Sequence, residues 1–224
     1  MNPLDAHNAA ITACRACPRL IAWCEQVARD KKAAYRDQPY WGRPVPGFGD
    51  PAARLLLVGL APAAHGANRT GRMFTGDRSG DWLYRALHKA GFASQPTSTA
   101  RDDGQTLRDA YISAVVRCAP PGNKPLPAER DACIGYLNRD LDLLPDLRVL
   151  VCLGKFAWDG LLALMKQRGH TPAPAPAFGH GAETTLGPYH LLGSYHPSQQ
   201  NTFTGKLTEP MLDAIFTRAR TLLR

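Results

Sequence analysis

Residues 54–60 read Arg-Leu-Leu-Leu-Val-Gly-Leu, and this short apolar run decides the fold. Three similar runs follow: residues 111–117 (Tyr-Ile-Ser-Ala-Val-Val-Arg), 148–154 (Arg-Val-Leu-Val-Cys-Leu-Gly) and 190–196 (His-Leu-Leu-Gly-Ser-Tyr-His). Each is nearly continuously apolar rather than alternating with polar residues, which is typical of strands that are buried on both faces. We therefore predict four strands at the centre of a parallel sheet.

Helical patterns separate these strand-like runs. Apolar side chains recur at helical spacing in four segments, residues 77–90, 127–143, 156–166 and 209–223. Residues 94–105 are polar, so we expect a loop there. Residues 172–180 are rich in Pro and Ala, so we expect an exposed connection before the last strand. The alternation predicts an α/β fold, a three-layer α/β/α sandwich with a central four-stranded parallel sheet, formed by a single domain over residues 1–224.

The composition agrees with one compact domain and excludes several classes of protein. The chain has 224 residues, of which 44% are hydrophobic, which is atypical of a disordered or fibrous protein. Its most apolar run, residues 55–64, is far shorter than the roughly 20 residues that cross a membrane. The N-terminus resembles no signal peptide, so we expect a cytoplasmic protein with reduced cysteines. The net charge of +8 (27 Lys and Arg against 19 Asp and Glu) modestly favours nucleic acid as the partner, although it also serves solubility.

Six cysteines fall into two groups. The candidate metal ligands are Cys14, Cys17, Cys118 and Cys133. Cys24 and Cys152 lie on apolar stripes, where cysteine usually acts as a small hydrophobe. Four thiolates are able to hold a structural zinc ion or a [4Fe-4S] cluster, and spacing alone slightly favours zinc. The alternative is that only the Cys14-x2-Cys17 pair has a function, or that all the cysteines are inert.

The loop after the first predicted strand, residues 59–77, combines glycines with polar and aromatic side chains. It lacks the Gly-Lys-Ser/Thr that ends a nucleotide P-loop. His65 and Asn68 offer hydrogen bonds, and Phe74 offers a flat face on which a planar base stacks. Taken singly, His65 fits a residue that satisfies loop backbone and Phe74 fits a core aromatic. Together in one glycine-rich loop they favour a base-binding pocket.

A second polar loop, residues 195–207, follows the last predicted strand. His196 ends that strand and is placed to donate a hydrogen bond into the crevice at the carboxyl ends of the strands. The expected phosphate contacts come from Ser198, Thr202, Thr204 and Lys206. We expect the segment from Gln199 to Leu207 to enter a DNA duplex, with Phe203 or Leu207 as the wedge. An ordinary solvated loop with a structural histidine is the alternative.

The loop after the second predicted strand, residues 117–125 (Arg-Cys-Ala-Pro-Pro-Gly-Asn-Lys-Pro), contributes Asn123. The side-chain amide presents a donor and an acceptor, which is what the edge of a pyrimidine requires. A Gly-Asn pair in a Pro-rich loop is more often simply a turn.

These motifs carry a resemblance to a known family. They are Cys14-x2-Cys17, residues 40–50 (Tyr-Trp-Gly-Arg-Pro-Val-Pro-Gly-Phe-Gly-Asp), the loops 59–77 and 117–125, and residues 196–205 (His-Pro-Ser-Gln-Gln-Asn-Thr-Phe-Thr-Gly). In them the chain resembles the uracil-DNA glycosylase superfamily over nearly its whole length, and within it the iron-sulfur-containing fifth family. The resemblance implies a four-stranded parallel sheet between helices and excision of deaminated bases from DNA. It also implies a [4Fe-4S] cluster, in place of zinc, on Cys14, Cys17, Cys118 and Cys133.

The resemblance further implies roles for individual residues. The loop that contains Gly59, Ala61, Ala63 and Asn68 positions the base and the attacking water. Phe74 stacks on uracil, Asn123 reads its edge and His196 stabilises the departing base. The base must first be flipped out of the duplex.

Position 61 departs from many relatives, which have an Asp or Asn there to hold or activate the water. The resemblance links Ala61 to a wider substrate range that includes hypoxanthine and exocyclic cytosine adducts, and small side chains at Ala61 and Ala63 suit a roomier pocket. Asp77 is the nearest carboxylate to help the water, while His65 or Asn68 would orient it instead. No lysine is placed for Schiff-base attack, so we expect a monofunctional glycosylase without lyase activity. We also expect a monomer. The alternative is a catalytically inactive, metal-stabilised module that binds or senses damaged DNA.

Overall fold

A six-stranded sheet forms the centre of the computed structural model, which describes residues 2–224. The strands are β1 (Phe48–Gly49), β2 (Leu55–Gly59), β3 (Ala110–Ala114), β4 (Val149–Leu153), β5 (Glu183–Leu186) and β6 (Tyr189–Ser194). Their order in the sheet is β1-β3-β2-β4-β6-β5. The four central strands run parallel, and β1 and β5 pair antiparallel with β3 and β6 at the two edges.

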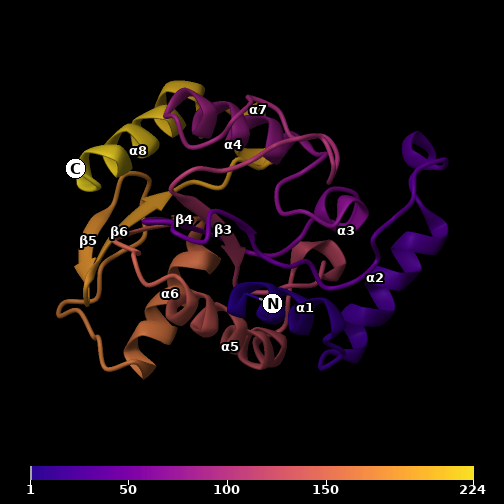
Figure 1. The fold of residues 1–224 in the computed structure, drawn as a ribbon, viewed down its shortest axis with the longest axis horizontal. Helices are drawn as coiled ribbons and strands as arrows, with labels where there is room; N and C mark the ends of the chain where they lie inside the picture. Colours follow the sequence, from indigo (N-terminus) through magenta and orange to yellow (C-terminus); the bar gives the residue numbers. More distant parts are fainter. Residues whose placement is uncertain (1) are drawn as a thin grey trace.

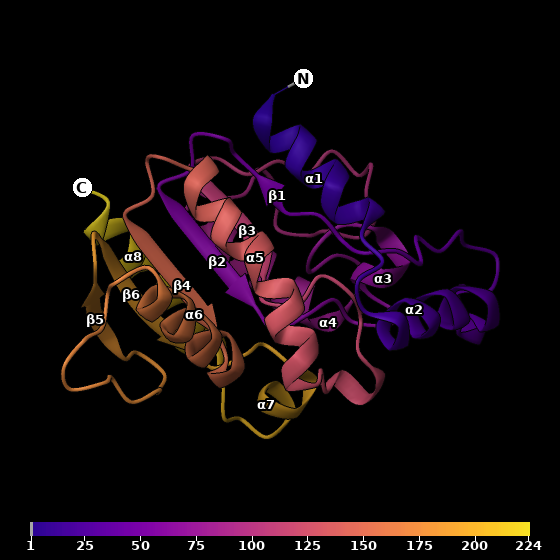
Figure 2. The same ribbon diagram turned by 90° about the horizontal axis from the view of Figure 1, so that it is seen from below.

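Helices cover both faces of the sheet, as Figures 1 and 2 show. The helices are α1 (Pro3–Ala13), α2 (Pro18–Asp30), α3 (Ala67–Thr70), α4 (Arg78–Lys89), α5 (Pro127–Leu143), α6 (Lys155–Gln167), α7 (Gln199–Phe203) and α8 (Glu209–Leu222), with short 3₁₀ turns η1 (Ala33–Tyr35) and η2 (Pro121–Asn123). The helices α1, α2, α5 and α6 pack on one face, and α4 and α8 on the other.

The strands are buried on both faces because their successive side chains enter two separate cores. Leu56 and Val58 of β2 pack with α5 and α6, whereas Leu55 and Leu57 pack with α4 and α8. Every residue of β2, β3 and β4 is buried. Full burial of one such side chain contributes roughly 1.5–3 kcal/mol, so these runs stabilise the sheet from both sides.

The predicted three-layer sandwich and its four parallel strands are confirmed, and the strand count needs one correction. Two edge strands, β1 and β5, were not predicted. β1 has only two residues, and β5 reads Glu-Thr-Thr-Leu with just one buried residue, so neither has the apolar run of a central strand. The helix predicted at residues 127–143 has those bounds in the structure. Among residues 2–224 no helix is long and apolar enough to cross a membrane.

Parallel strands bring three long loops to one edge of the sheet. The segments after β2, β3 and β6 all leave from the carboxyl ends of neighbouring strands. In Figure 2, α7 and the N-terminal end of α5 lie at this same end of the molecule. Ligands of open α/β sheets bind at this edge, so the predicted site residues are expected to meet there.

Candidate active site

Two adjoining hollows lie at the carboxyl edge of the sheet. The inner one includes Gly59, Phe74 and Ala114 in its lining, and the outer one, of about 540 Å³, includes Asn123 and Gln199. Both are lined by Ala61, Ala63, Asp77, Ser79 and His196. Residues from three different loops therefore share one crevice, as the sequence predicts.

Phe74 forms one wall of the inner hollow in a backbone conformation that favours glycine. Its φ is 53°, and its ring centroid lies 5.8 Å from that of His196 at an angle of 32°. A Cβ atom added to Gly59 would lie 3.1 Å from the Phe74 ring. Glycine at position 59 therefore lets the aromatic ring approach the end of β2. A left-handed non-glycine residue at a pocket wall is a strained feature of the kind that gathers at functional sites.

His196 stands where β6 ends and lines both hollows. Burial lowers the pKa of its imidazole to about 4, so the ring is neutral near pH 7. The Asn201 side-chain amide donates to the His196 carbonyl oxygen at 2.8 Å and fixes the backbone at this position. A neutral imidazole carries one N–H that is able to donate into the crevice.

Asp77 is the one carboxyl group that lines either hollow within residues 2–224. Its Oδ1 accepts a hydrogen bond from the Gly80 amide at 3.0 Å and caps the N-terminus of α4. Burial raises the pKa of this carboxyl, although the amides of Gly80 and Ser79 oppose the change. A Cβ atom added to Gly66 would lie only 1.9 Å from Asp77 Oδ2, so the glycine leaves room for the carboxyl group.

Asn123 lies on the opposite rim of the outer hollow, at the end of η2. Its φ is 57°, and it follows Gly122 at 59°, so two consecutive residues adopt the left-handed region. The Gly-Asn pair is therefore a turn, and the turn presents Asn123 at the crevice.

His65 and Asn68 lie outside both hollows, unlike the other predicted pocket residues. His65 Nδ1 is 3.0 Å from the Tyr40 hydroxyl. The Asn68 amide is fully buried and donates to the Cys24 carbonyl oxygen at 3.3 Å, which joins the loop to α2. In this arrangement both side chains support the loop and do not reach a ligand in the crevice.

The loop after β6 folds into the short helix α7, which presents polar side chains to the crevice. Ser198 caps α7 by accepting from the Asn201 amide, and Gln199 lies exposed at the rim. Thr202 is half-buried and its hydroxyl donates to the Gln199 carbonyl oxygen. The Lys206 ammonium lies 4.8 Å from the centre of the Tyr195 ring.

Only one of the two predicted wedge residues is available to DNA. Leu207 is fully buried in the core beside α8, so its prediction as a wedge is wrong. Phe203, by contrast, is 69% exposed. The sequence alone does not separate them because both are large apolar residues in the same loop.

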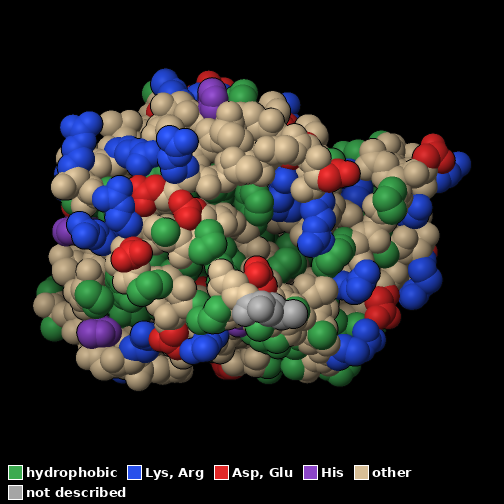
Figure 3. All heavy atoms as spheres, viewed as in Figure 1, with side chains coloured by type: hydrophobic (Ala, Val, Ile, Leu, Met, Phe, Trp, Pro, Cys, Tyr) green, Lys and Arg blue, Asp and Glu red, His purple; other side chains and the backbone are tan. Residues whose placement is uncertain are grey.

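The net positive charge of the chain does not form a uniformly basic surface. On the face in Figure 3, Lys and Arg side chains are interspersed with Asp and Glu. Beside the crevice, Arg78 lines the outer hollow and Lys206 follows α7. Neither forms an ion pair with any residue in 2–224, so both remain available to a phosphate.

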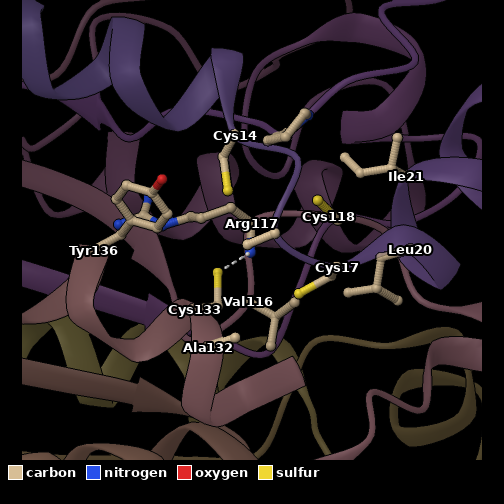
Figure 4. Close-up of a pocket in the computed structure, with 12 residues that line it drawn as sticks. Cys14, Cys17, Leu20, Ile21, Val116, Arg117, Cys118, Ala132, Cys133 and Tyr136 are labelled. Atoms are coloured by element: carbon tan, nitrogen blue, oxygen red, sulfur yellow. Dashed lines mark hydrogen bonds between the residues drawn. The ribbon is translucent and has the colours of Figure 1, made fainter. Parts of the chain in front are cut away.

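The four candidate ligand cysteines converge on one apolar pocket (Figure 4). Cys14 and Cys17 flank the break between α1 and α2, Cys118 follows β3, and Cys133 lies in α5. The Arg117 backbone N–H donates to Cys133 Sγ at 3.3 Å. Within residues 2–224, no group of three or more His, Cys, Asp or Glu side chains is arranged to hold a single metal ion.

The remaining two cysteines are core residues, as predicted. Cys24 and Cys152 are fully buried, and Cys24 Sγ donates to the Ala119 carbonyl oxygen at 3.5 Å. Burial raises the pKa of Cys152 above the normal range of a thiol. Neither residue lines the pocket of the other four thiols.

A buried charge network adjoins the cysteine pocket. The Arg117 guanidinium pairs with Asp140, which also accepts from the Ser113 hydroxyl at 2.6 Å and contacts His7 Nε2 at 3.0 Å. Although burial raises it, the pKa of Asp140 stays below its usual value because of Arg117 and His7. Arg117 lines the cysteine pocket, and its Nε and Nη1 have no hydrogen-bond partner within residues 2–224. Buried, unused donors of a cation beside four thiols suit an anionic group.

Comparison with known proteins gives one consistent result. Residues 46–220 match the family model described as the uracil DNA glycosylase superfamily. The chain is 58% identical over 217 residues to a type-5 uracil-DNA glycosylase of Mycobacterium bovis, covering 96% of this chain and 80% of that protein. It is 52% identical over 219 residues to a type-5 uracil-DNA glycosylase of Thermus thermophilus, covering 97% of each. A type-4 uracil-DNA glycosylase of Archaeoglobus fulgidus is 29% identical over 155 residues, which cover 69% of this chain and 70% of that protein.

Proposed function

The chain belongs to the uracil-DNA glycosylase superfamily, and we propose that it removes uracil from DNA by hydrolysing the N-glycosidic bond between the base and its deoxyribose. The observation that carries this proposal is the meeting of Phe74, His196 and Asn123, from three separate loops, around one crevice. The inner hollow has an aromatic wall and a mostly apolar lining with few polar side chains, which is what a flipped base requires.

Phe74 and Asn123 bind the flipped base. Phe74 offers a ring held against Gly59, and base–aromatic stacking contributes about 1–3 kcal/mol. The amide of Asn123 supplies a donor and an acceptor at the rim of the outer hollow, and it reads the edge of uracil.

His196 stabilises the leaving base. Glycosidic cleavage develops positive charge on the sugar and negative charge on the base. Because burial lowers the pKa of His196 to about 4, its ring donates a hydrogen bond as a neutral group without placing a second cation in the crevice. One preorganised donor to a developing anion contributes about 3–4 kcal/mol to catalysis.

Asp77 positions the water and balances the cationic sugar. Ala61 lines both hollows and has no group that takes up a proton. The nearby carboxyl of Asp77 is fixed by the Gly80 amide and stands in the same lining. Little base strength is needed once the sugar is strongly cationic, so a positioned carboxyl group suffices.

Small side chains at Ala61 and Ala63 leave room beside the base, and they support excision of larger deaminated bases such as hypoxanthine. Phe74, Asn123 and His196 belong to the same chain, so their proposed roles need no second copy, which supports a monomer. No lysine lines either hollow within residues 2–224, which supports hydrolysis without a lyase step.

A [4Fe-4S] cluster would be held by Cys14, Cys17, Cys118 and Cys133. Their convergence on one apolar pocket supports a group that is held by four thiolates, and in a [4Fe-4S] cluster each cysteine binds a different iron. The two unused N–H groups of the Arg117 guanidinium suit its negative charge. The cluster would supply a cross-link between the N-terminal segment, the loop after β3 and α5, and the residues of the crevice act without it in the chemical step.

The test is release of free base from oligonucleotides that contain one uracil, hypoxanthine or ethenocytosine, as single strands and as duplexes. We expect release of uracil that leaves an abasic site. Stoichiometric binding without release of any base would instead support the alternative of a damage-sensing module, which the glycosylase relatives do not favour. A brown protein that contains iron and sulfide supports the cluster, and a colourless zinc protein contradicts it.

A further inference from the structure

Two large apolar side chains are exposed within residues 2–224, and each follows a rim residue of the crevice closely in the chain. Leu126 is 51% exposed and Phe203 is 69% exposed. Leu126 follows the rim residue Asn123 by three positions, and Phe203 follows the rim residue Gln200 by three. They belong to the segments after β3 and β6, and both segments contribute rim residues to the outer hollow.

Leu126 is exposed but held rigidly. Prolines precede and follow it, and its backbone N–H donates to Glu129 Oε2 at 2.7 Å. Glu129 is buried and accepts two further bonds at 2.7 Å from the Arg19 guanidinium. Arg19 Nη2 also donates to the Lys124 carbonyl oxygen at 3.3 Å. An ion pair between the buried Glu129 and the partly exposed Arg19 therefore fixes the backbone that carries the leucine.

Phe203 is also held by the structure around it, in the segment after β6. It is the last residue of α7, whose N-terminus is capped by Ser198. The Arg78 guanidinium lies 5.4 Å from the centre of its ring, and Arg78 itself lines the outer hollow. Phe203 is one of the two residues that the sequence predicts as the wedge, and it is the one that is exposed.

We propose that Leu126 is a second DNA-inserting residue, which enters the base stack of the duplex opposite Phe203. The proposal rests on the proposed function, because the occupant is the stack around a flipped uracil. Flipping leaves a gap in the strand and an unpaired partner base, and apolar wedges stabilise unstacked steps of this kind. Phe203 fills the gap on one side of the crevice, and Leu126 presses on the stack from the other.

The mounting of Leu126 also gives the cysteine segment a mechanical purpose. Arg19 lies in α2, two residues after Cys17. The segment that carries Cys14 and Cys17 therefore adjoins Arg19 in the chain. The Arg19 guanidinium binds Glu129 and the Lys124 carbonyl oxygen, and so holds the backbone at residues 124–126. Anchoring this segment keeps the wedge in place.

The experiment compares duplex and single-stranded substrates that contain one uracil. Leu126→Ala keeps the backbone N–H that Glu129 binds and removes only the wedge. We expect kcat/KM for the uracil-guanine duplex to fall about tenfold, the order of one base contact, while the value for the single strand stays within about twofold. Leu126→Phe should restore the duplex value. Leu143→Ala, at the far end of the same helix α5, is the matched control and should leave the ratio unchanged.

A binding readout separates insertion from catalysis. 2-Aminopurine is placed beside the target in a duplex that contains 2′-fluoro-deoxyuridine, which resists cleavage. Wild-type protein should raise the fluorescence as the step unstacks, and Leu126→Ala should reduce that rise at saturating protein. Unchanged duplex activity and fluorescence would overturn the proposal and point to a protein partner for Leu126. Absence of uracil release from both the duplex and the single strand by the wild type would instead refute the proposed function.

Discussion

The neutral state of His196 makes a prediction with a definite magnitude. Burial lowers the pKa of this imidazole to about 4 from an ordinary value near 6.5. The difference corresponds to a cost on the order of 3 kcal/mol for charging the ring inside the folded protein. The histidine should therefore remain uncharged from pH 8 down to about pH 5.

The sign of the pH effect on stability follows from proton binding. As the pH falls from about 6.5 to about 4, the unfolded chain takes up a proton at His196 that the folded chain refuses. The stability that comes from keeping His196 neutral is fully present above pH 6.5, declines as the pH falls through that window, and is lost below about pH 4. His196→Gln removes this group. Between about pH 6.5 and about pH 4, the variant should therefore lose less unfolding free energy than the wild type, by an amount on the order of 3 kcal/mol.

NMR titration with isotope-labelled histidine tests the assignment, since the resonance absent from His196→Gln identifies the ring. We expect a midpoint near 4. In the same samples, kcat/KM of the wild type should show no inflection near pH 6.5 that is due to His196. His196→Ala should lose roughly 10²–10³-fold in kcat and still bind DNA, whereas His196→Gln, which keeps an N–H donor, should lose less. A midpoint at or above 6, or full activity of His196→Ala, would refute this reasoning.

Three further predictions follow from local geometry. Asp77→Asn keeps the cap of α4, because Asn is as good an N-cap, so the melting temperature should change little. The variant loses the carboxylate, so kcat should fall at least about tenfold; unchanged kcat would remove Asp77 from the mechanism. Gly66→Ala places a methyl group on the Asp77 carboxyl and should cost about 1–3 kcal/mol of stability together with activity, whereas Gly135→Ala, which meets nothing within 4 Å, should not destabilise the protein in the same melting assay. Cys133→Ser should abolish iron and visible absorbance in the purified protein, whereas Cys152→Ala should keep both; equal colour in the two variants would exclude Cys133 as a ligand.

Much of the fold follows from the sequence because the central strands have an unambiguous signal. The run at residues 54–60 is apolar at nearly every position, and burial on both faces requires that pattern. β5 escapes notice because an edge strand needs only one buried side, and its two threonines read as polar. The Gly-Pro turn at residues 187–188, which joins β5 to β6, is the signal that could have revealed it.

The site is predicted less evenly, for a physical reason. Loop residues at the carboxyl ends of parallel strands converge by topology, so Phe74, Asp77 and His196 meet as expected. Whether a polar loop residue faces the ligand or its own backbone depends on tertiary contacts. Asn68 turns toward the Cys24 carbonyl oxygen, and Leu207 turns into the core, and neither choice is visible in local sequence.

Two residues that support the crevice and its rim are not predicted from the sequence as functional residues. Asn201 holds the His196 carbonyl oxygen, and Glu129 holds the Leu126 amide, through side chains that read as ordinary surface polar groups. Their importance comes from the partner that the fold brings to them.

The central claim is that uracil is bound and released in the crevice between Phe74, Asn123 and His196. A crystal structure with duplex DNA that carries 2′-fluoro-deoxyuridine tests this claim most directly. The account predicts a flipped uracil stacked on the Phe74 ring, with its O2 accepting a hydrogen bond from the His196 ring and its edge on the Asn123 amide. A base bound elsewhere, or an unflipped duplex held only by its phosphates, would contradict it.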